Sequence, residues 1–290
     1  MGDSVLYDLL KPQACIDAFH LDFSGYTLPE KVKKFHSISI VTTCMDRCSC
    51  IKQTYKKNID DSLSYPNVEF VLINYNSKDD LDGYVRNNLI GYIESGILNY
   101  YRTNEPKYYS MCHSRNIGFT MAKGEIVCSV DADHYINKGF PERINSLANI
   151  FHEKTVFCKS KHKNRGRLCF RKKEFFEMLG GYDEAIKGYG FDDQDLLCRA
   201  ARLGFKIVKF GGDFCRITED HRRHPGKNYE EHWRYTQRKN SLISLLNIKL
   251  GILKANEGKT TGKAFLIKNF KDDLKDIINT NILSEIYRWG

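Results

Sequence analysis

This sequence of 290 residues lacks the features that mark membrane-spanning, secreted and repeat proteins. No stretch approaches the roughly 20 apolar residues that a membrane-spanning helix needs. The segment Met1–Leu10 lacks a basic start followed by an apolar core, so the sequence predicts no secretory signal. Internal repeats and low-complexity linkers are also missing. With 41% hydrophobic residues, the chain is long enough for one large globular core with terminal additions.

Acidic residues are outnumbered by basic ones, which leaves a net charge of +9 at pH 7. Partners of the opposite sign are nucleic acids, anionic membrane surfaces and phosphorylated small molecules. A nucleic-acid binder would depend steeply on salt, but no recognition motif accompanies the charge. We therefore expect no nucleic-acid partner.

Paired cysteines are not expected, although the chain has ten. Cys44, Cys48 and Cys50 lie close together, but no second Cys/His pair follows at zinc-finger spacing. Cysteines inside apolar runs behave as small buried hydrophobic residues. We expect free thiols in a reducing compartment, which favours a cytoplasmic protein that could contact the inner membrane face peripherally.

Short β-branched runs alternate with helical patterns after residue 36. Strands are expected at 37–43, 68–74, 98–102, 126–130, 155–159, 167–170 and 205–210. Helices are expected at 51–63, 79–89, 110–122, 141–151 and 193–203. This alternation predicts an α/β fold with a mixed, mostly parallel sheet flanked by helices.

The two ends of the chain differ from this central pattern. Residues 1–36 are expected to form an N-terminal extension, 37–226 the main domain, and 227–290 a helical C-terminal extension. Within the last part, Phe265–Trp289 has the pattern of an amphipathic, lysine-containing helix or helix pair. Such a segment could lie on an anionic membrane, pack on the main domain or join a homo-oligomer.

Two carboxylates end the apolar run at 126–130. Asp131 and Asp133 flank Ala132 and are followed by His134. In open α/β sheets, ligands bind at the carboxyl ends of the strands. Carboxylates at positions i and i+2 repel each other unless a cation joins them, and hard oxygen ligands suit Mg²⁺ or Mn²⁺. An isolated Asp-x-Asp pair can equally be a solvated turn.

A second acidic group opens the helix expected at 193–203. Asp192, Asp193 and Asp195 follow the glycine-rich segment Gly188–Tyr189–Gly190. Helix capping and the helix dipole explain one or two acids at this position. They explain less well the glycines, which let a backbone approach a ligand closely.

Six motifs lie in order between Ser37 and His224: Thr42–Thr43, Asn74–Asp80, Ser114–Gly118, Asp131–Asp133, Gly180–Glu184 and Gly190–Leu196. Together they resemble the motifs of GT-A fold glycosyltransferases. The similarity is closest to the inverting family-2 branch, including chondroitin-polymerase-like enzymes, with a C-terminal half like that of β-1,4-galactosyltransferases. The resemblance implies a GT-A (Rossmann-like) catalytic domain over residues 37–226.

The resemblance also implies a reaction: metal-dependent transfer of a hexose or N-acetylhexosamine from a UDP-sugar to a hydroxyl of a glycan or glycoconjugate, with inversion. Asp193 would be the general base, and Asp192 would hydrogen-bond the acceptor or the donor sugar. In such enzymes the second aspartate of the Asp-x-Asp motif, here Asp133, binds Mn²⁺ or Mg²⁺ directly, and Asp131 contacts the ribose or the metal through water. Either His221 or His224 would complete the coordination.

Substrate contacts follow from the same resemblance. Residues expected to bind the donor nucleotide are Thr42, Thr43, Arg47, Asn74, Asn76, Asp80, Arg115, Asp131 and Ala132. Tyr189, Gly190 and Phe191 are expected to contact the acceptor or the sugar. Asn74 and Asn76 replace the aspartates that are common in the family, and Tyr189 and Phe191 also depart from its pattern. A retaining transferase and a catalytically silent nucleotide-sugar-binding module are the alternative interpretations.

Overall fold

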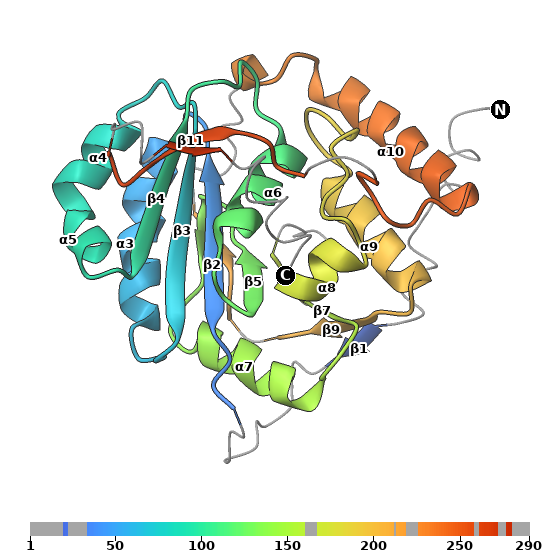
Figure 1. Ribbon diagram of the computed structural model, residues 1–290, viewed down its shortest axis with the longest axis horizontal. Helices are drawn as coiled ribbons and strands as arrows, with labels where there is room; N and C mark the ends of the chain where they lie inside the picture. Colours follow the sequence, from blue (N-terminus) through green and yellow to red (C-terminus); the bar gives the residue numbers. More distant parts are fainter. Residues whose placement is uncertain are drawn as a thin grey trace.

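The computed structural model describes residues 20–22, 34–159, 167–211, 213–218, 226–257, 261–271 and 277–279. The strands of its main sheet are β1 (His20–Asp22), β2 (Ile38–Cys44), β3 (Val68–Tyr75), β4 (Leu98–Thr103), β5 (Ile126–Ser129), β7 (Thr155–Cys158), β8 (Leu168–Arg171), β9 (Lys206–Lys209), β11 (Phe265–Lys268) and β12 (Ile277–Asn279). The ten strands follow the order β1-β9-β7-β8-β5-β2-β3-β4-β11-β12 (Figure 1). Two short strands, β6 (His134–Tyr135) and β10 (Arg216–Ile217), pair separately.

The centre of the sheet is parallel. Strand β2 pairs in parallel with both β3 and β5, and β3 pairs in parallel with β4. Strand β8 lies antiparallel between β5 and β7, and β11 lies antiparallel beside β4. Because β2 and β5 run in the same direction, the residues that follow them meet at one edge of the sheet.

Helices cover both faces of the sheet. They are α3 (Cys48–Ser62), α4 (Leu81–Asn88), α5 (Ile90–Glu94), α6 (Met111–Met121), α7 (Phe140–Ile150), α8 (Lys172–Glu177), α9 (Asp192–Arg202) and α10 (Trp233–Lys249). Helices α3, α4 and α5 lie on one side, and α6, α8, α9 and α10 lie on the other (Figure 1). This layering confirms the expected α/β class and most of the expected central elements.

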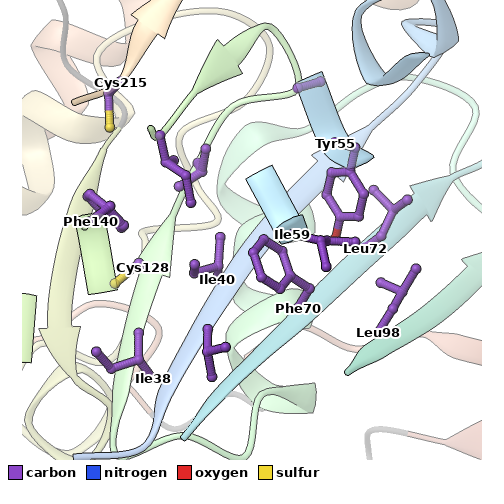
Figure 2. Packing of buried hydrophobic residues seen from close by; sticks show 14 of the residues in the cluster. Ile38, Ile40, Tyr55, Ile59, Phe70, Leu72, Leu98, Cys128, Phe140 and Cys215 are labelled. Carbon is purple, nitrogen blue, oxygen red and sulfur yellow. The ribbon is translucent and has the colours of Figure 1, made fainter. Parts of the chain in front are cut away.

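The directions in which side chains point along the strands explain why helices cover both faces of the sheet. Along β2, Ile38 and Ile40 belong to the core on the α3 side, whereas Val41 belongs to the core on the α6 side. In β3, Phe70 and Leu72 face the α3 side, and Figure 2 shows them packed with residues of α3. Successive side chains of a strand point to opposite faces, so a strand buried on both faces is a continuous apolar run.

The C-terminal part differs from the sequence-based expectation. A helix, α10, is present after residue 227, but the helix or helix pair expected over Phe265–Trp289 is wrong where the structure describes it. Residues 265–268 form β11 and residues 277–279 form β12. Leu266 is fully buried, and β11 supplies backbone partners to the outer edge of β4. Pairing with that open edge outweighs the local helical spacing.

The expected N-terminal extension also contributes to the sheet, because β1 pairs in parallel with β9. The remaining parts of residues 1–36 that precede Lys34 lie outside the described residues. Within the described residues, no helix is both long and apolar enough to cross a membrane. The nine cysteines that the structure describes are all buried, and no disulfide joins any two of them.

Candidate active site

A cleft of about 540 Å³ opens where β2 and β5 end. The end of β2 contributes Thr43, and the segment after β5 contributes residues 131–134. The walls are completed by the first residues of α6 and α9 and by Gln237 of α10. The two acidic groups of the sequence, which lie about 60 residues apart along the chain, therefore line one cleft.

Arg115 joins these two acidic groups. Its guanidinium is buried and donates from Nη2 to Asp131 Oδ1 at 3.0 Å and from Nη1 to Asp193 Oδ1 at 3.0 Å. The same Nη1 also contacts Asp192. Arg115 lies in the first half of α6, so one side chain from that helix forms ion pairs with carboxylates from two other segments. A planar guanidinium with several fixed donors suits such a bridging position.

Two motifs of the sequence meet behind Arg115. The Asn116 side chain donates to Tyr182 O at 2.9 Å and accepts from Tyr182 N at 2.9 Å. This pairing fixes the glycine-rich turn at 180–181 against α6. The Tyr182 ring then lies under the Arg115 guanidinium, 5.3 Å from ring centroid to Cζ, and its hydroxyl donates to Asp193 Oδ1 at 3.3 Å.

Asp193 is an unusual carboxyl group because it is buried with other acids nearby. Burial, together with the negative charges of Asp192 and Asp131, raises the pKa of Asp193 to about 7, although the Arg115 cation opposes this shift. The N-cap of α9 is Phe191, and the hydrogen bonds of the Asp193 side chain come from Arg115 and Tyr182 rather than from the helix backbone. Helix capping therefore does not account for Asp193. A carboxylate with a pKa near neutrality is suited to general base catalysis.

Asp133 has the opposite electrostatic environment. Burial would raise its pKa, but the hydrogen bond and charge of His134 and the cations Arg47 and Arg167 outweigh burial and lower the pKa to about 2. Arg47 Nη2 lies 3.0 Å from Asp133 Oδ2, and His134 Nδ1 lies 2.7 Å from Asp133 Oδ1. Asp133 is therefore ionised at neutral pH.

Asp131, Asp133 and His134 form a group that fits a divalent cation. One ligand atom from each lies within 4.8 Å of the others, in the only group of this kind that the described residues contain. Burial lowers the pKa of His134, which favours the neutral imidazole, and its Nε2 atom is buried without a hydrogen-bond partner among the described residues. Two carboxylates and a neutral imidazole are ligands that Mn²⁺ accepts.

The loop before α9 is shaped by left-handed backbone conformations. Gly188 and Gly190 have φ values of +70° and +88°, and a Cβ on Gly188 would lie 2.8 Å from Thr236 Cγ2. Phe191 also has a positive φ of 72° without being a glycine. This backbone turns the start of α9 toward the cleft, and strained residues of this kind often occur at functional sites.

The structure brings together many of the residues that the sequence singled out. Those that line the cleft are Thr43, Arg47, Arg115, Asp131, Ala132, Asp133, Tyr189, Gly190, Phe191, Asp192 and Asp193. Their roles as catalytic, metal-binding and substrate-binding residues stay predictions. His221 and His224 lie outside the described residues.

Four of the expected nucleotide contacts do not line this cleft. Thr42 is buried, and the Asn74 side chain donates to Tyr100 and Asp82 at 2.8 Å in each case. Asn76 donates to a backbone carbonyl at 2.7 Å. Asp80 is exposed beside α3, with its carboxylate 3.7 Å from Lys52 Nζ.

Other cleft residues were not singled out for these roles from the sequence. His134 was noticed only as the residue after the acidic pair, although its position directly beside Asp133 was the available signal. Arg167, the first residue of the strand expected at 167–170, is buried in the cleft wall. Tyr109 and Tyr229 carried no recognisable pattern, because they reach the cleft through contacts between distant parts of the chain.

Solved structures share the arrangement of this sheet and its helices. A mannosyltransferase of Pyrobaculum calidifontis in complex with GDP-Man and Mn²⁺ is 16% identical, with a TM-score of 0.55, over 85% of this chain and 71% of its own. TarS 1-349 of S. aureus in complex with UDP-GlcNAc is 18% identical, with a TM-score of 0.54, over 73% and 67%. GalNAc-T7 with UDP, GalNAc and Mn²⁺ is 14% identical, with a TM-score of 0.54, over 74% and 48%.

At these identities the likeness establishes the fold, which is that of the GT-A glycosyltransferases. The description of glycosyl transferase family 2 matches residues 39–208, which is more than half of the chain. The chain belongs to this family and is a glycosyltransferase. A comparison with curated proteins finds no significant match.

Proposed function

We propose that the chain transfers a hexose or an N-acetylhexosamine from a UDP-sugar to a hydroxyl of a glycan or glycoconjugate, with inversion at the anomeric carbon. The observation that carries this proposal is the convergence of Asp193 and the pair Asp131 and Asp133 on one cleft, joined by Arg115. Inverting transfer needs groups that bind the diphosphate of the donor and a base near the incoming hydroxyl.

We assign binding of the donor to the residues at the end of β5. Asp131, Asp133 and His134 would hold Mn²⁺ or Mg²⁺, which as a Lewis acid stabilises the charge of the departing diphosphate. Arg47 and Arg167 add positive charge to the same wall of the cleft. Solved relatives by fold contain Mn²⁺ with GDP-Man or UDP, which agrees with this assignment.

The acceptor side is assigned to the start of α9. Asp193 would take the proton of the acceptor hydroxyl as that oxygen attacks the anomeric carbon. Arg115 and Tyr182 both donate to Asp193 Oδ1 and thereby hold the carboxylate in place. Tyr189 and Phe191 offer aromatic surface beside it, on which a sugar ring can stack.

Replacement of the proposed base tests this assignment. Asp193→Asn keeps the size of the side chain but removes its basicity, so transfer should fall by about 10²–10⁴-fold. UDP should still bind, because the nucleotide is assigned to the residues at the end of β5 and not to Asp193. The matched control is Asp61→Asn at the end of α3, which removes one carboxylate from a surface pair with Lys57 and should leave transfer unchanged.

Transfer by Asp193→Asn close to that of the wild type would disprove the role of Asp193 as base. NMR of the product anomer separates inversion from retention. Release of UDP without transfer to any acceptor in a broad panel would favour a binding module instead.

A thermal-shift screen of nucleotide sugars tests the donor and the metal. A ligand at 100 times its Kd should stabilise the fold by about 2.7 kcal/mol, because it binds only the folded state. We expect the shift with UDP-sugars to require Mn²⁺ or Mg²⁺ and to disappear in Asp133→Ala. A larger shift with GDP-Man than with any UDP-sugar would overturn the uridine assignment, and a metal-independent shift would overturn the metal assignment.

A further inference from the structure

Helix α10 has its polar side turned inward. Thr236, Asn240 and Ser244 are the buried residues of this helix. The Asn240 side chain donates to Lys187 O at 2.9 Å and to Gly190 O at 2.8 Å, and Thr236 Oγ1 donates to Tyr189 O at 3.0 Å. These hydrogen bonds attach α10 to the loop that precedes Asp192, together with a ring contact between Trp233 and Tyr189 and the packing of Ile243 and Ile248 on the core.

A line of apolar side chains runs along the outward side of α10. Tyr235, Leu242 and Leu246 are 59%, 52% and 58% exposed. Their spacings of seven and four residues place them in one line along the helix. Leu250, just beyond the helix end, is 65% exposed and extends this line. A surface helix of a globular protein normally has the reverse arrangement, so an apolar outer line indicates an interaction surface.

Charge distinguishes between the surfaces that could cover this line. Between Trp233 and Lys254 the chain carries five cations and no acidic residue. These cations are Arg234, Arg238, Lys239, Lys249 and Lys254. Lys239, whose Nζ lies 3.5 Å from Glu231 Oε2, and Lys249 border the apolar line on opposite sides, at the angles that a helical repeat gives them. A second copy docked face to face would bring ten like charges together, whereas an anionic surface would attract them all.

We propose that the outer side of α10 docks on an anionic phospholipid bilayer. Leu242, Leu246 and Leu250 would enter the boundary between headgroups and acyl chains, and the bordering lysines would extend to the phosphates. Trp233, which is 45% exposed at the helix start, suits the membrane–water interface. Figure 1 shows α10 at the rim of the molecule, where a flat surface can reach it. This inference does not depend on the sugar, the acceptor or the reaction.

Co-sedimentation of the full chain with vesicles tests the proposal. The probes are vesicles of phosphatidylcholine alone and vesicles that also contain phosphatidylglycerol. We expect binding to the anionic vesicles only, and weaker binding as the salt concentration rises. Leu242→Gln/Leu246→Gln should weaken the binding by about tenfold or more, because two apolar side chains leave the contact.

The matched control is Leu63→Gln, which alters a 49% exposed leucine at the end of α3 and should bind like the wild type. Trp289→Phe leaves Trp233 as the single tryptophan, so its emission should shift to shorter wavelength when anionic vesicles are added. The proposal is overturned if the wild type ignores anionic vesicles, or if Leu242→Gln/Leu246→Gln binds them equally well. It is also overturned if the Trp233 emission stays constant while the protein sediments, or if light scattering shows a wild-type dimer that the double substitution dissociates.

Discussion

Asp193 lies beside one cation and two other carboxylates in a buried position, and this environment sets its affinity for protons. Because its pKa is raised to about 7, the carboxylate loses its proton only as the pH passes neutrality. A general base acts in its deprotonated form. We therefore expect kcat/KM to rise about tenfold per pH unit below pH 7 and to level off above it.

The measurement is the transfer rate at low donor concentration between pH 5.5 and 8.5, with the metal saturating. Asp133, with a pKa of about 2, does not titrate in this range and should not contribute to the profile. A rate that is constant across this range would contradict the role of Asp193 as the base.

At the scale of residues, the sequence predicted the two acidic groups but not the contacts that connect them. Asp131, Asp133 and Asp193 were identifiable because each follows a recognisable strand or glycine-rich turn. The buried position of Arg115 between them depends on the packing of α6 against β2 and α9, which no local pattern encodes. His134 was overlooked as a ligand because an imidazole after an acidic pair has no periodicity to mark it.

At the scale of elements, α9 depends on an ion pair inside the protein. Arg199 and Asp195 are each 1% exposed and lie 2.7 Å apart, and Arg199 also donates to the carbonyl oxygens of Leu179 and Gly181. Arg199→Leu leaves the Asp195 carboxylate and both carbonyl oxygens without this partner. We expect the free energy of unfolding to fall by about 3–5 kcal/mol.

Chemical denaturation measures this loss. The double variant Asp195→Asn/Arg199→Leu should recover part of the stability, because it no longer buries an unpaired charge. A loss below about 1 kcal/mol for Arg199→Leu, which is typical of an exposed ion pair, would contradict this account of the pair.

Elements with one strong local signal could be predicted, and those that depend on a distant partner could not. Strands β2, β3 and β5 are buried along almost their whole length and rich in apolar and β-branched residues, since both of their faces are covered by helices. Strand β11 is only four residues long, and its spacing of apolar residues also fits a helix. The unpaired edge of β4 decides its conformation, and that edge lies more than 160 residues earlier in the chain.

At the scale of the whole molecule, segments from outside the central 37–226 region pair with the outermost strands of that region at both edges of the sheet. Strand β1 covers the free side of β9, and β11 covers the free side of β4. We expect a fragment of residues 37–226 to self-associate, because both strand edges would be open for pairing with another chain. It would also lack α10, which holds the loop at 187–190.

Size-exclusion chromatography with light scattering compares this fragment with the full chain. A fragment that is monomeric and unfolds cooperatively would show that the terminal segments are dispensable for folding. Residues 37–226 would then be an independently folding catalytic domain with two extensions.

The shared guanidinium of Arg115 has a kinetic consequence for the proposed reaction. Its positive charge is divided among Asp131, Asp192 and Asp193, so the two halves of the cleft are electrically linked. Occupation of Asp131 by a loaded sugar nucleotide would leave more of that charge to Asp193 and make its carboxylate easier to ionise. The enzyme is therefore expected to load its substrates in sequence, with the sugar nucleotide entering before the alcohol that accepts the sugar.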